Sequence, residues 1–342
     1  MSSSASLRIG ICAVAVGVLL ALLPHCLEAQ MQVVNPKFGV VVDTHYNATA
    51  YSEVINAHLG WIRLPAYWRT IEITNSGCTV APNDPSQCHW SQLDQDVNGA
   101  VAQGSQVYIG IGYFAPQWAN GTQGQTCVMF VSNCAGNPPT NTSYYKNFVT
   151  ALVNRYKDRV QYYAIWNEPD QSVFWNSTIA KFSTDILVPG AKAVRAASPT
   201  AKVIGAEISD SANALGNVLF GTCSYIDFVA VHLFRYNVTN NTNHLQNDYI
   251  PAVNQQCGSS KPIWVTAFDF PPDKIPSPSD LTLQAQMLRD QLAALNGIPR
   301  VSRIMHYNMV DAASSPKKVL KNSVLPGTMA STFARRPDHA RR

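Results

Sequence analysis

The residue best suited to chemistry in this chain is Glu168, within the segment Trp166-Asn167-Glu168-Pro169. The segment closes the apolar run YYAIW (162–166), which is typical of a buried strand. A carboxyl group at the end of a buried strand can donate or accept a proton during a reaction. Its plainer interpretation is a glutamate at a helix entry beside a proline. We expect the catalytic role for Glu168.

Eight short apolar runs along the chain provide the elements that would position such a residue. They are continuous rather than alternating, as expected for parallel strands buried on both faces. Helical patterns lie between them, for example Tyr144 to Tyr156 and Leu281 to Leu295. Strand followed by helix eight times predicts an α/β fold, a single (β/α)₈ TIM barrel, over a doubly wound sheet. The runs are residues 38–42, 61–64, 107–112, 162–166, 202–206, 227–232, 262–266 and 303–307.

In such a barrel the active site lies at the carboxyl ends of the strands, so the residues that follow each run are the candidate site residues. Most of them are polar or aromatic, a set that suits sugar binding. They are Asp43, His45, Arg63, Trp118, Asn167, Glu168, Glu207, His232, Asp269, Tyr307 and Asn308.

The chain resembles the retaining β-glycoside hydrolases of clan A and is most similar to family 39 or a near neighbour. The resemblance spans nearly the whole chain after residue 29 and implies that Glu168 is the general acid/base. It also implies that Asn167 binds the sugar 2-hydroxyl and that Arg63 holds the nucleophile. The segments that carry it, besides Asn167-Glu168-Pro169, are GWIRLPAYWRTIE (60–72), IGYFAPQWA (111–119), HLF (232–234) and HYNMVDA (306–312).

The chain departs from this family at the nucleophile. Double displacement at a glycoside needs two carboxyl groups roughly 5 Å apart, one to protonate the leaving oxygen and one to attack the anomeric carbon. The family carries the second as a glutamate at the end of the seventh strand, in a stretch similar to Trp-Val-Thr-Glu-Phe. This chain has Ala267 there, within Trp264-Val265-Thr266-Ala267-Phe268-Asp269. A methyl group can neither attack nor stabilise a cationic transition state.

Four explanations remain open for Ala267. It is a substitution in an otherwise working enzyme, or Asp269 replaces the lost carboxylate, since residues two apart on a strand face the same side. An inverting reaction could instead use Asp269 or, less favoured, Glu207 as the base for a water molecule. The fourth is a catalytically impaired carbohydrate-binding protein. For Asp269 the plainer interpretation is a loop-opening residue before Pro271-Pro272.

The remaining candidates are expected to bind substrate. His45 and His232 would orient sugar hydroxyls or a carboxylate, and Trp118 would stack on a pyranose face. Arg63 closes an apolar strand, where an unpaired charge is costly, but its partner is unclear without a carboxylate at position 267. Tyr307 follows the eighth strand and belongs to the same group.

Composition and targeting signals narrow the functional class further. The 342 residues carry 25 Lys and Arg against 21 Asp and Glu, without a basic run inside the chain, which argues against nucleic-acid binding. Residues 1–29 resemble a secretory signal peptide, with lipid anchoring through Cys26 as the minor alternative. We therefore expect a secreted or periplasmic catalytic domain over residues 30–342, without stable membrane insertion. Its expected partner is an oligosaccharide, polysaccharide or glycoside.

Cysteines and missing motifs complete the expectations. Six cysteines remain after the leader, and Cys78/Cys88 and Cys127/Cys134 each bracket a short loop, so we expect neighbours to form disulfides. The sequence contains no glycine-rich phosphate loop, nucleophile elbow or metal triad. Nucleotide cofactors and catalytic metals are not implied.

Overall fold

The computed structural model describes residues 35–42, 59–75, 78, 88–270 and 281–307. The chain divides into a leading segment, Met1–Val33, and a compact unit, Val34–Arg342, which contains every described element. The expected signal peptide and the candidate residues Asp43, His45 and Asn308 lie outside the described residues.

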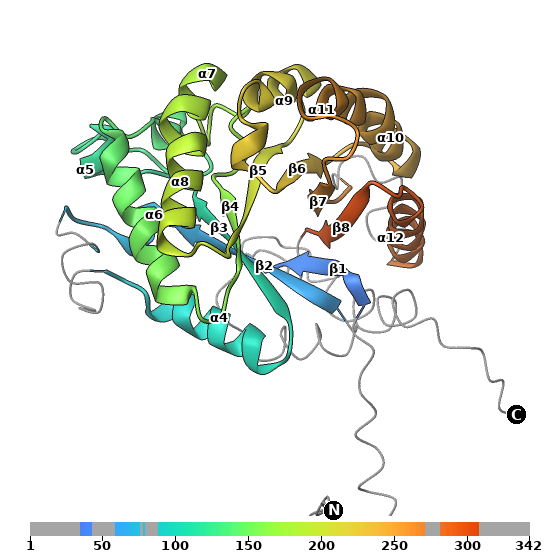
Figure 1. Cartoon of the computed structure of the whole chain (residues 1–342), viewed down its shortest axis with the longest axis horizontal. Helices are drawn as coiled ribbons and strands as arrows, with labels where there is room; N and C mark the ends of the chain where they lie inside the picture. Colours follow the sequence, from blue (N-terminus) through green and yellow to red (C-terminus); the bar gives the residue numbers. More distant parts are fainter. Residues whose placement is uncertain (1–34, 43–58, 76–77, 79–87, 271–280, 308–342) are drawn as a thin grey trace, which may run out of the picture. The chain divides into compact units, whose positions relative to one another are not determined.

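The described strands form a closed barrel, as Figure 1 shows. All neighbouring strands are parallel and follow the order of the sequence, with the last strand pairing with the first. The predicted (β/α)₈ barrel is therefore confirmed. The strands are β1 (Asn35–Val41), β2 (Leu59–Tyr67), β3 (Gln106–Gly112), β4 (Tyr162–Ile165), β5 (Lys202–Ile208), β6 (Phe228–Leu233), β7 (Ile263–Phe268) and β8 (Val301–His306).

Helices follow the strands and cover the outside of the barrel. The two helical patterns predicted from the sequence correspond to α6 and α12, and α6 lies beside α8 (Figure 1). Two of the longer helices contain a π-helical turn, η2 and η4. The helices are α3 (Trp68–Ile71), α4 (Ser91–Ala102), α5 (Gln117–Asn120), η1 (Asn133–Gly136), α6 (Thr142–Tyr156), α7 (Ile179–Phe182), η2 (Ser183–Leu187), α8 (Val188–Ala197), α9 (Ala212–Leu219), η3 (Cys223–Tyr225), α10 (Val238–Asn243), η4 (His244–Tyr249), α11 (Ile250–Cys257) and α12 (Leu281–Asn296).

Aromatic side chains close the amino-terminal end of the barrel. Trp61, Tyr162 and Trp264 stand at or near the start of their strands, and their ring centroids lie 4.8 to 5.7 Å apart. The guanidinium carbon of Arg303 lies 4.8 Å from the Trp61 ring centroid, within cation–π range. This packed floor leaves the carboxyl-terminal end for a binding site.

Three disulfides connect loops and helices around the barrel. Cys78–Cys88 and Cys127–Cys134 confirm the two predicted pairs, and Cys223–Cys257 joins η3 to the end of α11. Within the described part of the chain, no helix is both long and apolar enough to span a membrane.

Candidate active site

A cavity of about 560 Å³ opens at the carboxyl-terminal end of the barrel, which is within the usual size of small-molecule sites. One wall is apolar and comes from the ends of β2 and β4 and from the loop after β3. The rest of the lining comes from β1, β2, β6 and β7 and from the segments that follow β4, β5 and β8. The cavity thus lies where parallel barrels place their chemistry.

Six of the residues predicted from the sequence line this cavity. They lie on or directly after five different strands, although they are up to 244 residues apart in sequence. The barrel brings them together because all strand ends meet at one rim. They are Arg63, Asn167, Glu168, His232, Ala267 and Tyr307.

Three of the predicted residues that the structure describes do not line the cavity: Trp118, Asp269 and Glu207. The Trp118 ring packs between Trp68 and Tyr144, and its Nε1 donates to the Glu72 carbonyl oxygen at 3.0 Å. It therefore has a structural environment and offers no face to a sugar in the cavity.

Asp269 also lies away from the cavity. Its side chain is 41% exposed, accepts the backbone N–H of Phe270 at 2.7 Å and lies 3.7 Å from the His306 ring. The alternation that predicted Asp269 to share a face with Ala267 does not extend to it, because β7 ends at Phe268.

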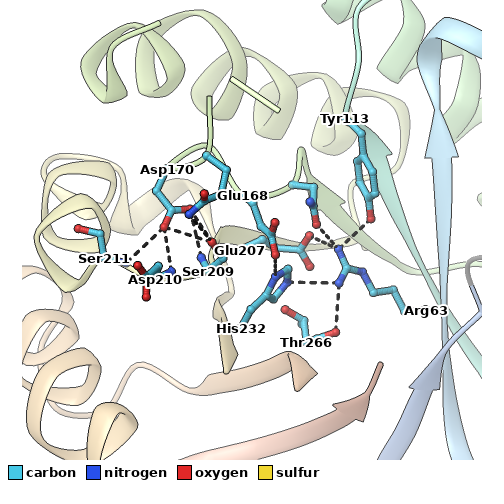
Figure 2. A network of polar contacts seen from close by, with 12 residues as sticks. Arg63, Tyr113, Glu168, Asp170, Glu207, Ser209, Asp210, Ser211, His232 and Thr266 are labelled. Carbon is cyan, nitrogen blue, oxygen red and sulfur yellow. Dashed lines mark hydrogen bonds and ion pairs between the residues drawn. The ribbon is translucent and has the colours of Figure 1, made fainter. Parts of the chain in front are cut away.

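Arg63 is the hub of the site, as Figure 2 shows. Its guanidinium is buried and donates to the Glu207 carboxylate and to Asn167 Oδ1, both at 2.7 Å, and to the Tyr113 hydroxyl at 2.8 Å. The Thr266 carbonyl oxygen accepts a further bond at 3.2 Å. Glu207 is thus the partner that the sequence left unidentified.

The charge of Arg63 is secured by Glu207. Burial opposes the charged guanidinium, but the Glu207 carboxylate together with Tyr108 and Tyr113 more than offsets this effect, so the pKa of Arg63 lies well above its usual value. Glu207 is 0% exposed and does not line the cavity. It is therefore a buried counter-ion and not the rim residue suggested by its place at a strand end.

His232 connects Arg63 to Glu168. Arg63 Nη1 lies 3.2 Å from His232 Nε2, and His232 Nδ1 lies 2.6 Å from Glu168 Oε1 (Figure 2). A guanidinium can only donate, so Nε2 must accept and the ring proton must be on Nδ1. Glu168 Oε1 therefore accepts a hydrogen bond from a neutral imidazole.

This tautomer has a chemical consequence for Glu168. Because Oε1 accepts from His232, an acidic proton on the carboxyl group belongs on Oε2. The Glu168 side chain is 15% exposed and lines the cavity. The arrangement can present one proton, from a fixed oxygen, to a ligand atom in the cavity.

The backbone at the strand ends is left-handed where it places these groups. Trp166 and Glu168 have φ of 68° and 43°, and Ala206 and Glu207 have φ of 83° and 45°. The Glu168 N–H donates to the Glu207 carbonyl oxygen at 3.0 Å, which joins the two turns. Such strained conformations cluster at functional sites.

Position 267 faces the cavity without a charge. Ala267 is buried at the barrel interior and lines the cavity. Among the described residues, Glu168 and Asp210 are the carboxylates that line the cavity. Asp210 is 61% exposed and pairs with Arg235 at 2.7 Å.

Asp170 holds the rim segment that carries Asp210. Its carboxylate accepts the backbone N–H groups of Ser209, Asp210 and Ser211 at 2.9 to 3.3 Å (Figure 2). Three N–H bonds to one carboxylate fix the segment after β5 against the segment after β4. Asp170 is thus a structural clamp at the rim.

The apolar wall was not predicted from the sequence. Its aromatic rings are Tyr67, Phe130 and Phe174, and Phe130 packs at 5.7 and 5.9 Å from the other two. Phe130 is 49% exposed and belongs to the loop closed by Cys127–Cys134. The short aromatic loop gave no periodic signal that would have marked it.

Tyr113 and Asp210 were also missed as site residues. Tyr113 lies within IGYFAPQWA and Asp210 two residues after β5, so closeness to a strand end was the signal available for both. Among the described residues, no group of His, Cys, Asp and Glu is arranged to hold a metal ion.

Comparison with protein families gives one clear match. The model described as glycosyl hydrolase catalytic core matches residues 96–332, which is more than half of the chain. Among curated protein sequences, none matches.

Several solved structures share the fold at low sequence identity. A family 39 glycoside hydrolase from Bacteroides cellulosilyticus WH2 has a TM-score of 0.62 and 15% identity over 89% of this chain and 64% of its own. A family 39 β-xylosidase from Caulobacter crescentus has a TM-score of 0.64 and 16% identity, over 87% and 71%. A family 128 endo-β-1,3-glucanase from Amycolatopsis mediterranei, solved with laminaritriose, has a TM-score of 0.51 and 15% identity, over 88% and 99%. This chain therefore spans less than two thirds of the first of these proteins.

Proposed function

The chain belongs to the glycosyl hydrolase catalytic core family, and from that premise we propose that its pocket binds a β-linked glycan or glycoside in an extracellular setting. Glu168 is the group that faces the glycosidic oxygen. The supporting observation is the Arg63–His232–Glu168 relay, which fixes one protonating oxygen at the wall of a sugar-sized cavity. The amide of Asn167 and the hydroxyl of Tyr307 are the further groups that bind the ligand in this proposal.

Among the residues that the structure describes, the same pocket has no carboxylate at the position of the nucleophile that double displacement needs. Position 267 offers a methyl group, Asp269 lies outside the cavity, and Glu207 is buried in an ion pair with Arg63. A retaining reaction needs a second carboxylate about 5 Å from the first, on the other side of the anomeric carbon. Binding without double displacement is therefore the function that the described residues support best.

Hydrolysis by single displacement is the second candidate, and one observation favours it. Asp210 places a second, well-exposed carboxylate at the cavity, where it can act as a base for water. Inverting pairs leave room for that water between carboxyl groups roughly 6.5 to 9.5 Å apart. This reaction would use Glu168 as acid and would invert the anomeric configuration.

Calorimetric titration of the folded full chain with xylo- and laminari-oligosaccharides tests the binding function. The two series follow the names of the similar structures. We expect saturable binding by the unmodified chain and by Glu168→Gln, and no release of reducing sugar from either. Asp269→Asn is the matched control, since it makes the same carboxyl-to-amide change outside the cavity and should bind equally. Failure of the folded chain to bind either series would contradict the proposal.

Release of reducing sugar would distinguish the second candidate. Turnover that Asp210→Asn and Glu168→Gln both abolish, with an inverted product seen by proton NMR, would establish single displacement. Turnover that persists in Glu168→Gln would remove Glu168 from either reaction.

A further inference from the structure

Glu207 is a buried charge that no step of the proposed function uses. Its side chain is fully buried, it does not line the cavity, and one carboxylate oxygen lies 2.7 Å from Arg63 Nη2. The other oxygen, Oε1, is buried and has no hydrogen-bond partner among the residues that the structure describes. Leaving an acceptor unpaired in the interior is costly, so another interaction of Glu207 must offset this cost.

The backbone around Glu207 is distorted to bring its side chain inward. Pairing between β5 and β6 shifts register between Ala206 and Ile208, so Glu207 is the extra residue of a bulge. Ala206 and Glu207 are both left-handed, although neither is a glycine. Such strain persists only where surrounding interactions compensate for it. The ion pair with Arg63 is the interaction that this bulge makes possible.

Arg63 in turn depends on Glu207 for a negative charge. Its other hydrogen-bond partners in the described part of the chain carry no charge: they are Tyr113, Asn167, the Thr266 carbonyl and the neutral ring of His232. A buried guanidinium without a counter-ion is strongly destabilising. Within the described part of the chain, Glu207 forms the ion pair that Arg63 requires.

We propose that Glu207 is a positioning residue: it gives Arg63 the negative counter-charge that a carboxylate at position 267 would otherwise provide. Glu207 does so from outside the cavity, whereas position 267 lies at the cavity wall. The proposal rests on the proposed function, in that position 267 belongs to a glycoside site. It explains how Arg63, and with it His232 and Glu168, keeps its arrangement beside a methyl group. It also means that the site resists the return of a carboxylate at position 267.

The resistance follows from charge balance at Arg63. Thr266 already accepts a hydrogen bond from Arg63 Nη1, so a glutamate at the next residue, at the cavity wall, would lie near the same guanidinium. Two buried carboxylates would then share one cation and compete for one proton, so position 267 would be ionised only part of the time. A protonated carboxyl group at position 267 cannot attack an anomeric carbon. Restoring the nucleophile fully therefore requires removal of the charge at Glu207 as well.

A double-mutant cycle tests this exchange of counter-ions. The four proteins are the unmodified chain, Ala267→Glu, Glu207→Gln and Ala267→Glu/Glu207→Gln, each unfolded in urea and each assayed on 2,4-dinitrophenyl β-glucoside and β-xyloside. We expect each single substitution to lower the unfolding midpoint and the pair to restore part of it, because one carboxylate again matches one guanidinium. We expect the double variant to turn over at least tenfold faster than Ala267→Glu. Additive losses of stability would overturn the proposal.

Two controls distinguish the effect of the new charge at position 267 from the effect of its size and from the effect of removing any buried carboxylate. Ala267→Gln has the size of Ala267→Glu without the charge, so it should destabilise less at neutral pH, and the two should converge as the pH falls. Equal losses for both at neutral pH would show a steric effect and overturn the proposal. Glu72→Gln, a buried carboxyl-to-amide change that does not touch Arg63, should add independently to Ala267→Glu.

The stability measurements test the role of Glu207, and the activity measurements test the role of position 267, so each can fail without the other. Coupled stabilities without turnover in any variant would support the charge exchange and count against the glycosidase-like role of position 267. Turnover by Ala267→Glu alone, at the rate of the double variant, would support the site and overturn the role of Glu207.

Discussion

At the scale of single residues, Arg63 determines the state of its neighbours. It pairs with Glu207 and fixes the tautomer of His232, which in turn orients Glu168. Removing the guanidinium would leave Glu207 buried without a partner. An unpaired buried carboxylate lowers the stability of the folded chain, and the first prediction concerns the size of this loss.

We expect Arg63→Met to lower the free energy of unfolding by about 3 to 5 kcal/mol, the usual cost of breaking a buried ion pair from one side. Urea denaturation at neutral pH measures the loss. Lys181→Met is the control, because Lys181 pairs with Asp185 on an exposed helix face and such pairs contribute less than about 0.5 kcal/mol. Equal losses in the two variants would contradict the burial argument.

Glu72 gives an expectation for pH dependence. Burial raises the pKa of Glu72, against the lowering effect of hydrogen bonds from Trp68 and the Cys78 backbone. Above the ordinary value of 4.5, the folded chain therefore binds a proton more readily than the unfolded chain. Stability should fall as the pH rises through the window between 4.5 and the raised pKa.

Glu72→Gln should remove this fall, because an amide does not titrate. The amide keeps only one acceptor oxygen for the two donors, which lowers stability by about 1 kcal/mol at every pH. Urea midpoints of both proteins across the acidic range measure the difference. A difference that does not shift in favour of the variant as the pH rises would contradict the assignment.

Residue types at strand ends predicted much of the site but not its pairings. Arg63 was expected to need a buried partner, because an unpaired charge is costly inside a barrel. That partner, Glu207, is 144 residues away in sequence and reaches Arg63 through a bulge, which no periodic pattern marks. Trp118 was expected at the cavity because it follows the third strand, but packing against Trp68 and Tyr144 holds its ring elsewhere.

At the scale of elements, the loop of residues 127–134 shapes the apolar wall of the cavity. The Cys127–Cys134 disulfide closes it, and Arg69 donates to the Cys127 carbonyl oxygen at 2.7 Å. Phe130 adopts a φ of 64° and packs against Tyr67 on one side while remaining half exposed on the other. A ring held in this way suits stacking on an aryl group or on the C–H face of a sugar.

We expect Phe130→Ala to weaken binding of phenyl β-glycosides about tenfold and of methyl β-glycosides much less, since ring stacking contributes about 0.5 to 1.5 kcal/mol. Calorimetric titration of both ligands measures the ratio. Val131→Ala is the matched control, because Val131 is 75% exposed on the same loop and does not line the cavity. The same change of ratio in both variants would exclude a specific contact.

The sequence predicted where the strands lie, but not which way the side chains point at the strand ends. Continuous apolar runs identified each strand that the structure describes, because barrel strands are buried on both faces. Register shifts between β5 and β6 and along β7 depend on local bulges, so alternation alone could not say that Glu207 points inward and that Asp269 lies outside the cavity.

At the scale of the whole molecule, the barrel order follows from the sequence more directly than the site does. Eight strand and helix repeats allow few arrangements, since parallel neighbours need crossover connections of one hand. Closure then brings the ends of β2 and β4 to β8 to one rim, and this step assembles the cavity. The specific contacts depend on atoms that meet only after closure.

Each disulfide stabilises this closed unit by an amount that rises with the logarithm of the number of residues that it encloses. Cys223–Cys257 spans 34 residues, including β6, whereas Cys127–Cys134 spans 7. Loop-closure entropy gives about 3.8 kcal/mol for the longer loop and about 2.4 kcal/mol for the shorter. We therefore expect Cys223→Ser/Cys257→Ser to lower the free energy of unfolding by more than Cys127→Ser/Cys134→Ser.

Ligand binding should change in the opposite order, because Phe130 belongs to the shorter loop while β6 is held by its pairing with β5 and β7. Urea denaturation of both double variants measures the loss of stability, and calorimetric titration under native conditions measures the change in binding. Since β6 carries His232, loss of binding in Cys223→Ser/Cys257→Ser at full folding would show that strand pairing alone does not position the relay. We expect Cys223→Ser/Cys257→Ser to retain binding and Cys127→Ser/Cys134→Ser to bind aryl glycosides more weakly. This result would show that the longer loop contributes mainly to stability and the shorter loop to ligand recognition.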